Sequence, residues 1–211
     1  ADGGPITALA IMDEVLVAFC ETATYSLAGD GFDNAGGGQN YGPARRLSAD
    51  VGAVSAEAVA LTPEGLIFKS TKGWYLLNRG GQAQYIGGPV AEFDGDEIRS
   101  VHTLESQHQI RCLTESRCLV FDYLVGQWSE WTISDGLGAT VWGGRYVYAS
   151  SATGAMAKRE GDDFSALAGE AYADGYGMDI QTGWIKLNEL QGYGRLRWAM
   201  LLGEYRSACA V

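Results

Sequence analysis

The sequence predicts an all-β fold made of repeated antiparallel units. Three observations support this: glycine is abundant while proline is scarce, hairpin-like segments recur along the chain, and two segments are apolar at every position. Gly accounts for 30 of the 211 residues and Pro for only 4, and aromatic residues make up 11%. Such a composition favours strands joined by tight turns over helices.

The recurring unit is a pair of strands joined by a short turn. The turns centre on Thr22, Thr71, Glu115 and Ala152, which lie roughly 37 to 49 residues apart. The paired segments are Val15–Cys20 with Thr24–Leu27, Gly65–Phe68 with Trp74–Leu77, Gln109–Leu113 with Cys118–Asp122, and Arg145–Ala149 with Ala155–Ala157. This period is typical of the blades of a β-propeller.

Each pair is expected to have neighbouring strands. Strands before the pairs are predicted at Ile6–Ala10, Ala56–Leu61, Ile98–Leu104 and Ala139–Trp142. Outer strands are predicted at Gln84–Ile86 and Gln127–Thr132. The repeating unit therefore has three or four antiparallel strands, and the fold class is a β-propeller-like array of blades.

The apolar segments favour stacked sheets. Val15–Cys20 and Cys118–Phe121 are apolar at odd and even positions alike, a pattern typical of strands buried on both faces. Neighbouring blades provide that burial in a propeller. A β-sandwich or barrel, which buries one face of each sheet, remains the alternative.

The tail of the chain departs from the repeat. We expect residues 1–165 to form the propeller-like repeats, with about four hairpin units. Residues 166–211 are expected to begin a second β domain, or to return to the protein body, through strands at Asp179–Leu187 and Tyr193–Ser207. Both ends look cut from a longer, truncated polypeptide.

The charge balance argues against nucleic-acid binding. Acidic residues number 26 and basic residues 15, for a net charge of −11. Binding to phosphates requires clustered Lys and Arg, and the basic residues here are scattered apart from Arg45-Arg46 and a loose group at Arg195, Arg197 and Arg206. No apolar run reaches the ~18 residues of a membrane-spanning helix, so no membrane partner is expected.

The cysteines and histidines match no known site. The four cysteines have no zinc or redox spacing. Cys112 and Cys118 are close enough in sequence for a disulfide across a hairpin, but buried thiols in a reducing cytosol are the favoured interpretation. His102 and His108 have no third partner nearby, so His102 is interpreted as structural and no metal site is assigned.

Two loops and two tryptophans are candidates for a functional role. Asp30–Gln39 is Gly-rich but lacks the ligand pattern of a calcium loop, so we interpret it as a connector that contacts a neighbouring subunit. The acidic run Glu92–Glu97 could supply the carboxylate pair of a glycosidase, but a solvated turn is favoured. Trp128 and Trp131 should point to opposite faces of their strand, with one packed between blades. No catalytic residue and no cofactor is assigned.

Several phrases of the sequence resemble one family of structural proteins. They are Ile6–Leu9 with Asp13–Leu27, Asp50–Gly52, Glu64–Val90, Cys118–Trp131 and Gly183–Ser207. Together they resemble the propeller of tail hub or nozzle proteins from short-tailed bacteriophages, which are also described as stabilisation proteins. The shortened fourth unit departs from the family pattern because it lacks an aromatic outer strand.

The resemblance implies a structural virion protein with no enzymatic activity and no cofactor. It implies a homo-oligomeric ring, typically a hexamer, in a virion tail assembled in the host cytoplasm. Such a ring continues the DNA channel below the portal and adaptor proteins, closes the tail until DNA ejection, and docks tail fibres or a needle. Genomic DNA would pass without specific binding, with acidic loops such as Glu92–Glu97 or Asp162-Asp163 facing the lumen. A carbohydrate-binding or carbohydrate-acting β-propeller is the alternative, and a propeller scaffold of a cellular complex a third possibility.

Overall fold

The computed structural model describes residues 3–29, 35, 37, 41–48, 50–133, 136–151 and 156–159. The chain divides into two units, Ala1–Arg159 and Glu160–Val211. All of the described residues belong to the first unit. The predicted second part, residues 166–211, lies outside them, as do most of the Gly-rich loop Asp30–Gln39 and the acidic pair Asp162-Asp163.

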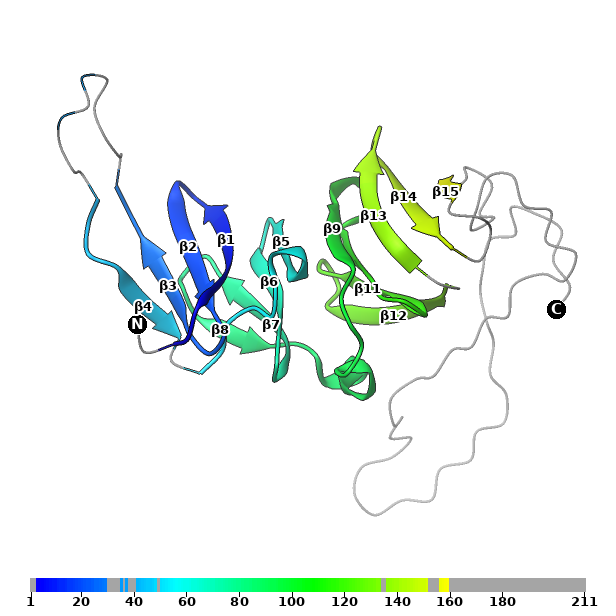
Figure 1. The fold of residues 1–211 in the computed structure, drawn as a ribbon, viewed down its shortest axis with the longest axis horizontal. Helices are drawn as coiled ribbons and strands as arrows, with labels where there is room; N and C mark the ends of the chain where they lie inside the picture. Colours follow the sequence, from blue (N-terminus) through cyan, green and yellow to red (C-terminus); the bar gives the residue numbers. More distant parts are fainter. Residues whose placement is uncertain are drawn as a thin grey trace, which may run out of the picture. The chain divides into compact units, whose positions relative to one another are not determined.

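The first unit contains four antiparallel sheets that follow one another along the chain (Figure 1). Sheet 1 consists of β1 (Ile6–Met12), β2 (Val15–Cys20), β3 (Thr24–Leu27) and β4 (Arg45–Ser48). Sheet 2 consists of β5 (Val59–Thr62), β6 (Gly65–Ser70), β7 (Gly73–Asn78) and β8 (Ala83–Tyr85). Sheet 3 consists of β9 (Ser100–Leu104), β10 (Gln109–Leu113), β11 (Arg117–Asp122) and β12 (Gln127–Thr132). Sheet 4 consists of β13 (Gly136–Trp142), β14 (Arg145–Ser150) and β15 (Met156–Arg159).

Within every sheet the strands pair in sequence order, so each sheet is a simple meander. The first strands of successive sheets contact one another: β1 contacts β5, β5 contacts β9, and β9 contacts β13. Hydrogen bonds reinforce this arrangement, since Thr103 Oγ1 donates to the Leu61 carbonyl at 2.7 Å and the His102 ring binds the Ala139 carbonyl at 2.7 Å. Meanders of three or four antiparallel strands joined along their first strands are propeller-like blades, which confirms the predicted fold class.

Three apolar layers hold the sheets together. Between sheets 1 and 2, Phe19 packs on Phe68 with ring centroids 4.8 Å apart. Between sheets 2 and 3, Trp74 packs on Trp128 at 5.5 Å. Between sheets 3 and 4, a layer including Leu113, Cys118, Val120 and Tyr146 is buried. Tightly packed layers of this kind account for most of the stability of a β fold.

Strands of the inner sheets bury both of their faces, as the apolar pattern predicted. In β6, Leu66 and Phe68 face sheet 1, whereas Ile67 faces sheet 3. In β11, the alternating residues divide in the same way between sheets 2 and 4. In β12, Trp128 belongs to the layer toward sheet 2 and Trp131 to the layer toward sheet 4, so the predicted opposite orientations are confirmed. Both tryptophans pack between sheets, however, rather than only one of them.

Local details differ from the expectations. Ala56–Ala58, expected as the start of a strand, forms the short 3-10 helix η1, and the strand begins only at Val59. Gly88–Phe93 forms a second such helix, η2, and Glu105–Gln107 a third, η3. The outer strand Arg45–Ser48 was not predicted at all. The second hairpin is tighter than expected, because β6 continues through Lys69 to Ser70 before the turn.

Candidate functional site

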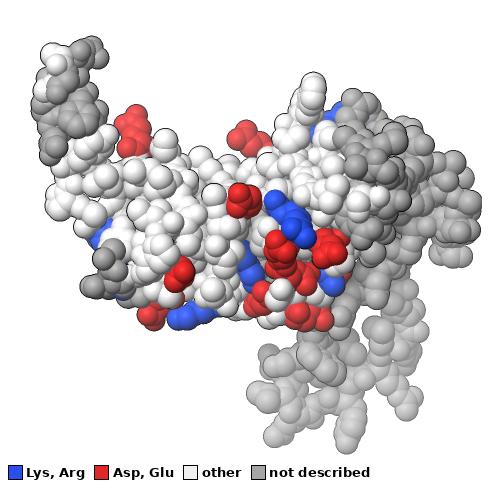
Figure 2. All heavy atoms as spheres, viewed as in Figure 1, with Lys and Arg blue, Asp and Glu red and all other residues white. Residues whose placement is uncertain are grey.

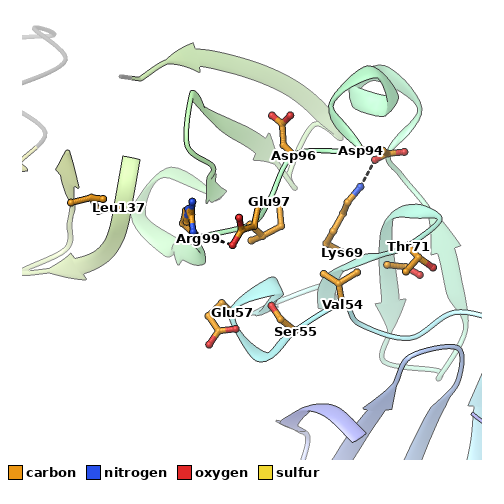
Figure 3. A pocket seen from close by; sticks show the side chains of 12 residues that line it. Val54, Ser55, Glu57, Lys69, Thr71, Asp94, Asp96, Glu97, Arg99 and Leu137 are labelled. Carbon is orange, nitrogen blue, oxygen red and sulfur yellow. Dashed lines mark hydrogen bonds and ion pairs between the residues drawn. The ribbon is translucent and has the colours of Figure 1, made fainter. Parts of the chain in front are cut away.

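A polar pocket of the described region lies where sheet 2 meets sheet 3. It has a volume of about 720 Å³. Figure 3 shows one wall formed by Val54, Ser55 and Glu57, and a facing wall formed by the segment from Asp94 to Arg99. This segment links η2 to β9, so the pocket is built around the connection between two blades.

Lys69 lies at the buried edge of the pocket. The strand β6 is buried at every position, and the Lys69 side chain is only 4% exposed. Its ammonium group donates to Asp94 Oδ1, the interaction drawn in Figure 3, and it lies 6.0 Å from the centre of the Trp74 ring. A buried charge is tolerated when it is paired, so Asp94 is the residue that makes a lysine acceptable in this strand.

A second ion-pair group lies on the sheet 3 side. The guanidinium of Arg117 contacts Asp96 at 2.8 Å and Glu130 at 2.5 Å. It also lies 3.9 Å from the centre of the Phe93 ring, within cation–π range. Arg117 therefore fastens the connecting segment, through Asp96 and Phe93, to the hairpin of β11 and β12.

A third pair joins Arg99 to Glu97 at 3.0 Å. Glu97 is 74% exposed, so this pair is screened by water and contributes little to stability. Figure 2 shows acidic and basic side chains gathered side by side on one part of the molecular face, while most of the remaining described surface carries neither. The pocket rim thus combines charges of both signs.

The acidic run Glu92–Glu97 turns at the surface, as expected, but three of its acids also have cation partners that the sequence did not indicate. Asp94, Asp96 and Glu97 are each held by a cation. Lys69 and Arg117, the partners of Asp94 and Asp96, were not identified from the sequence as site residues. One signal was available for Lys69: a single charged residue in a segment that is otherwise apolar must find a partner once that segment is buried on both faces.

The pocket contains hydroxyls, paired carboxylates and paired cations. Such groups can hold a polar ligand or brace the junction of two sheets. Among the residues that the structure describes, no three His, Cys, Asp or Glu side chains come together in a way that could bind a metal ion. The described stretches also contain no helix with the length and hydropathy required to span a membrane.

Neither of the two histidines lines the pocket. His102 is bound to the Ala139 carbonyl and joins β9 to β13, which agrees with its interpretation as a structural residue. His108 follows η3 with φ of 56° and lies edge-on to Tyr123, with ring centroids 6.0 Å apart. The structure does not bring the two histidines into one site.

The buried thiols are separate from one another. Cys20, Cys112 and Cys118 are buried thiols. In the hairpin register Cys112 faces Leu119, so the disulfide that the spacing allowed does not form. Burial, together with the nearby Cys118, raises the pKa of the Cys112 thiol well above its usual value. Burial likewise raises the pKa of Tyr146, whose hydroxyl lies 3.8 Å from the Cys118 sulfur.

Sheet 1 has one apolar face that no described residue covers; we call it the open face. It is formed by side chains of β1, β2 and β3 that point away from sheet 2, and they are Leu9, Ile11, Leu16, Ala18, Tyr25 and Leu27. Leu9 is 60% exposed and Ile11 67% exposed. The sequence predicted that Val15–Cys20 would be buried on both sides, whereas Leu16 and Ala18 are only half-buried.

Comparisons with known proteins show the fold alone. No family model and no curated protein matches this chain. Among solved structures, the extracellular domain of BT4673 from B. thetaiotaomicron is similar with a TM-score of 0.52 and 10% identity, over 77% of this chain and 21% of that one. The WD40 domain of Neurospora crassa Pan2 gives a TM-score of 0.48 with 16% identity, over 69% of this chain and 44% of that one. This chain therefore spans less than half the length of either of these two structures.

Proposed function

We propose that this chain is a structural virion protein of a short-tailed bacteriophage. In this proposal it is a tail hub or nozzle component that forms a ring, most simply a hexamer, below the portal and adaptor. The ring continues the DNA channel and docks other tail proteins such as fibres or a needle. It needs no cofactor and performs no catalysis.

The open face of sheet 1 is the observation that favours an assembly role. An apolar sheet face that no described part of the chain covers is typical of a surface that another protein covers. The phrases that resemble the tail proteins also fall on paired strands of single sheets, because Asp13–Leu27 contains β2 and β3 and Glu64–Val90 contains β6, β7 and β8.

The first strands of the sheets support a role beside DNA. Their sequences are ITALAIM, VALT, SVHTL and GLGATVW, and none contains Lys or Arg. A surface without cations cannot displace the counterions that surround the DNA phosphates, so it gains no free energy from their release and DNA has no electrostatic reason to adhere to it. The expectation that the acids of Glu92–Glu97 face a lumen stays a prediction, and their pairing with Lys69, Arg99 and Arg117 reduces the charge that they would present.

Electron microscopy of the purified chain, alone and mixed with portal and adaptor proteins, tests the proposal. We expect rings that bind the adaptor end of a portal complex, and no retention of double-stranded DNA at low salt. The proposal is wrong if the chain ignores portal complexes and binds DNA with a steep salt dependence.

The pocket favours one second candidate, a carbohydrate-binding or carbohydrate-acting propeller. Its carboxylates and the hydroxyls of Ser55, Ser70 and Thr71 are groups that bind sugars. Each carboxylate of the connecting segment already has a cation partner, which weighs against this candidate. A glycan array and a hydrolysis assay distinguish the two, since specific glycan binding abolished by Ser55→Ala would favour the carbohydrate function.

A further inference from the structure

We infer that the pocket between sheets 2 and 3 binds an extended, uncharged, aliphatic segment of a partner protein through its main chain. This inference goes beyond the proposed tail function, because it assigns a ligand class to a site that ring formation does not use. It follows from three properties of the pocket: its fixed walls, the hydrogen-bonding groups of its lining, and the balance of its charges.

Backbone hydrogen bonds hold both walls of the pocket in place. On one wall, the Val54 amide donates to the carbonyl of Lys69 at 2.9 Å, so this wall is fixed to β6 at the residue that carries the buried ammonium group. On the facing wall, the Arg99 amide donates to the Leu113 carbonyl of β10 at 2.8 Å. Walls that are fixed before binding lower the entropic cost of holding a ligand.

The pocket has a polar end and an aliphatic end. Figure 3 shows Lys69 near Asp94 and Thr71 on one side of the lining, and Leu137 far from them on the other side. Leu137 is the extra residue of a β-bulge where the pairing of β13 with β14 shifts register, and it is 53% exposed. Bulges redirect side chains, and this one places an apolar group in the lining. An extended chain can contact both ends, and a volume of about 720 Å³ is large enough for a ligand of that kind.

Lys69 and Glu57 can bind the main chain of a peptide. The Lys69 ammonium group has three N–H donors; Asp94 Oδ1 accepts one of them, and no other described residue supplies a hydrogen-bond acceptor. The Lys69 side chain is 4% exposed, and a buried donor without an acceptor costs free energy. On the opposite wall, Glu57 is exposed and makes no hydrogen bond or ion pair with the described residues. A peptide main chain supplies a carbonyl oxygen for the ammonium group and an N–H for the carboxylate.

The charges of the lining favour an uncharged ligand. Three of the four carboxylates already have cation partners, and the pairs are Asp94 with Lys69, Asp96 with Arg117, and Glu97 with Arg99. An anion that entered would compete with Asp94 for Lys69. A cation that entered would meet the ammonium group at the buried end, where like charges repel strongly.

The apolar part of the lining favours a peptide over a sugar. No aromatic side chain on which a sugar ring could stack is among the described residues that line the pocket. Val54, Ile98 and Leu137 instead offer contacts to aliphatic side chains. Main-chain amides joined to aliphatic side chains match both ends of the pocket. In the proposed tail function this segment would belong to an adjoining tail protein.

Titration of the full chain with capped tripeptides tests the inference. The probes are acetylated and amidated at their ends, so that they carry no charge, and have alanine, valine or leucine between two alanines. Ligand-observed NMR should give a dissociation constant of about 1 mM or lower for the leucine peptide. Maltotriose, inorganic phosphate and spermidine represent sugars, anions and cations, and each should bind about tenfold more weakly or not at all.

Two variants locate the binding site, and circular dichroism checks that each is folded. Lys69→Met removes the ammonium donors while keeping much of the side-chain volume, and should weaken binding of the leucine peptide about tenfold or more. Leu137→Ser should weaken it about fivefold through lost apolar contact, and its 53% exposure means that folding does not depend on it. Lys72→Met is the matched control, since Lys72 is exposed in the turn after β6 and does not line the pocket. Its affinity should equal that of the unmodified chain.

Three results would overturn the inference. The peptides could fail to bind at about 5 mM, a concentration that detects even weak complexes. Maltotriose, phosphate or spermidine could bind more tightly than every peptide, which would assign the pocket to a sugar, an anion or a cation instead. The leucine peptide could bind folded Lys69→Met and Leu137→Ser as it binds the unmodified chain, which would place it elsewhere. These measurements need no portal or adaptor, so their failure leaves the proposed tail function intact, whereas a chain that binds the peptides but ignores portal complexes would refute only that function.

Discussion

The pair of Lys69 and Asp94 offers the sharpest test of how the second and third sheets are joined. The Lys69 side chain is 4% exposed and that of Asp94 29% exposed, so one member of the pair is buried and the other reaches water. Removing Asp94 leaves a buried ammonium group without its carboxylate. Removing the charge of Lys69 leaves a carboxylate that water can reach.

We expect these two changes to have unequal effects. Breaking a buried pair by removing one partner costs about 3–5 kcal/mol, and the partial exposure of Asp94 places Asp94→Ala near the lower end, at about 3 kcal/mol. Lys69→Met should cost about 1 kcal/mol, because methionine fills much of the same volume and the carboxylate becomes hydrated. The double variant should be more stable than Asp94→Ala alone by roughly 2 kcal/mol, since it no longer buries a charge.

Urea unfolding monitored by tryptophan fluorescence measures these differences, and Trp74 beside Lys69 is one of the six tryptophans that contribute to the signal. In thermal unfolding, Asp94→Ala should lower the Tm by roughly 6–12 °C for a chain of this length. Lys72→Met is the control, because Lys72 is exposed in the adjacent turn. The reasoning fails if Asp94→Ala costs less than about 1 kcal/mol or if the double variant is the least stable of the set.

Three further predictions concern other parts of the fold. Gly52→Ala should destabilise the protein by about 3 kcal/mol, because the new Cβ would lie 1.7 Å from the Cys20 carbonyl oxygen. Gly138→Ala is the control: a Cβ there would meet no atom within 4 Å, so its free energy of unfolding in the same urea titration should be unchanged. Because burial raises the pKa of Tyr146, the unfolded chain should lose the Tyr146 proton above pH ~10 while the folded chain keeps it, and the free energy of unfolding should therefore fall as the pH rises. Tyr146→Phe should reduce this fall. The buried Cys112 thiol, with its raised pKa, should resist alkylation until the chain unfolds. Peptide mapping by mass spectrometry measures this, and alkylation of Cys112 in the folded protein would contradict the prediction.

The fold was predictable because its signals are local and repeated. Turn residues and apolar strands recur at the blade period, and a segment such as Cys118–Phe121 shows its two-sided burial directly in its composition. The strand Gln127–Thr132 was predicted with its observed bounds. These features depend on residues close in sequence, so reading the chain in order finds them.

What the sequence did not reveal depends on contacts between distant segments. Arg45–Ser48 is a short strand with two charged residues, and it becomes a strand only by pairing with β3 across the Gly-rich connection. The partner of Lys69 lies 25 residues away, on a connection whose path no local pattern specifies. Ala56–Ala58 has the composition of a strand edge, yet it turns as a 3-10 helix where the chain enters sheet 2.

The meander topology also bears on how such a chain can change over evolutionary time. The strand-to-strand hydrogen bonds of each sheet join strands that follow one another along the chain, and the sheets adhere to one another mainly through side chains. Energy in such an array is nearly a sum over modules and nearest-neighbour interfaces. Duplication or loss of the coding segment for one sheet would therefore require new complementary packing only where that sheet meets its neighbours. The number of sheets is thus easier to change than the interior of any one of them.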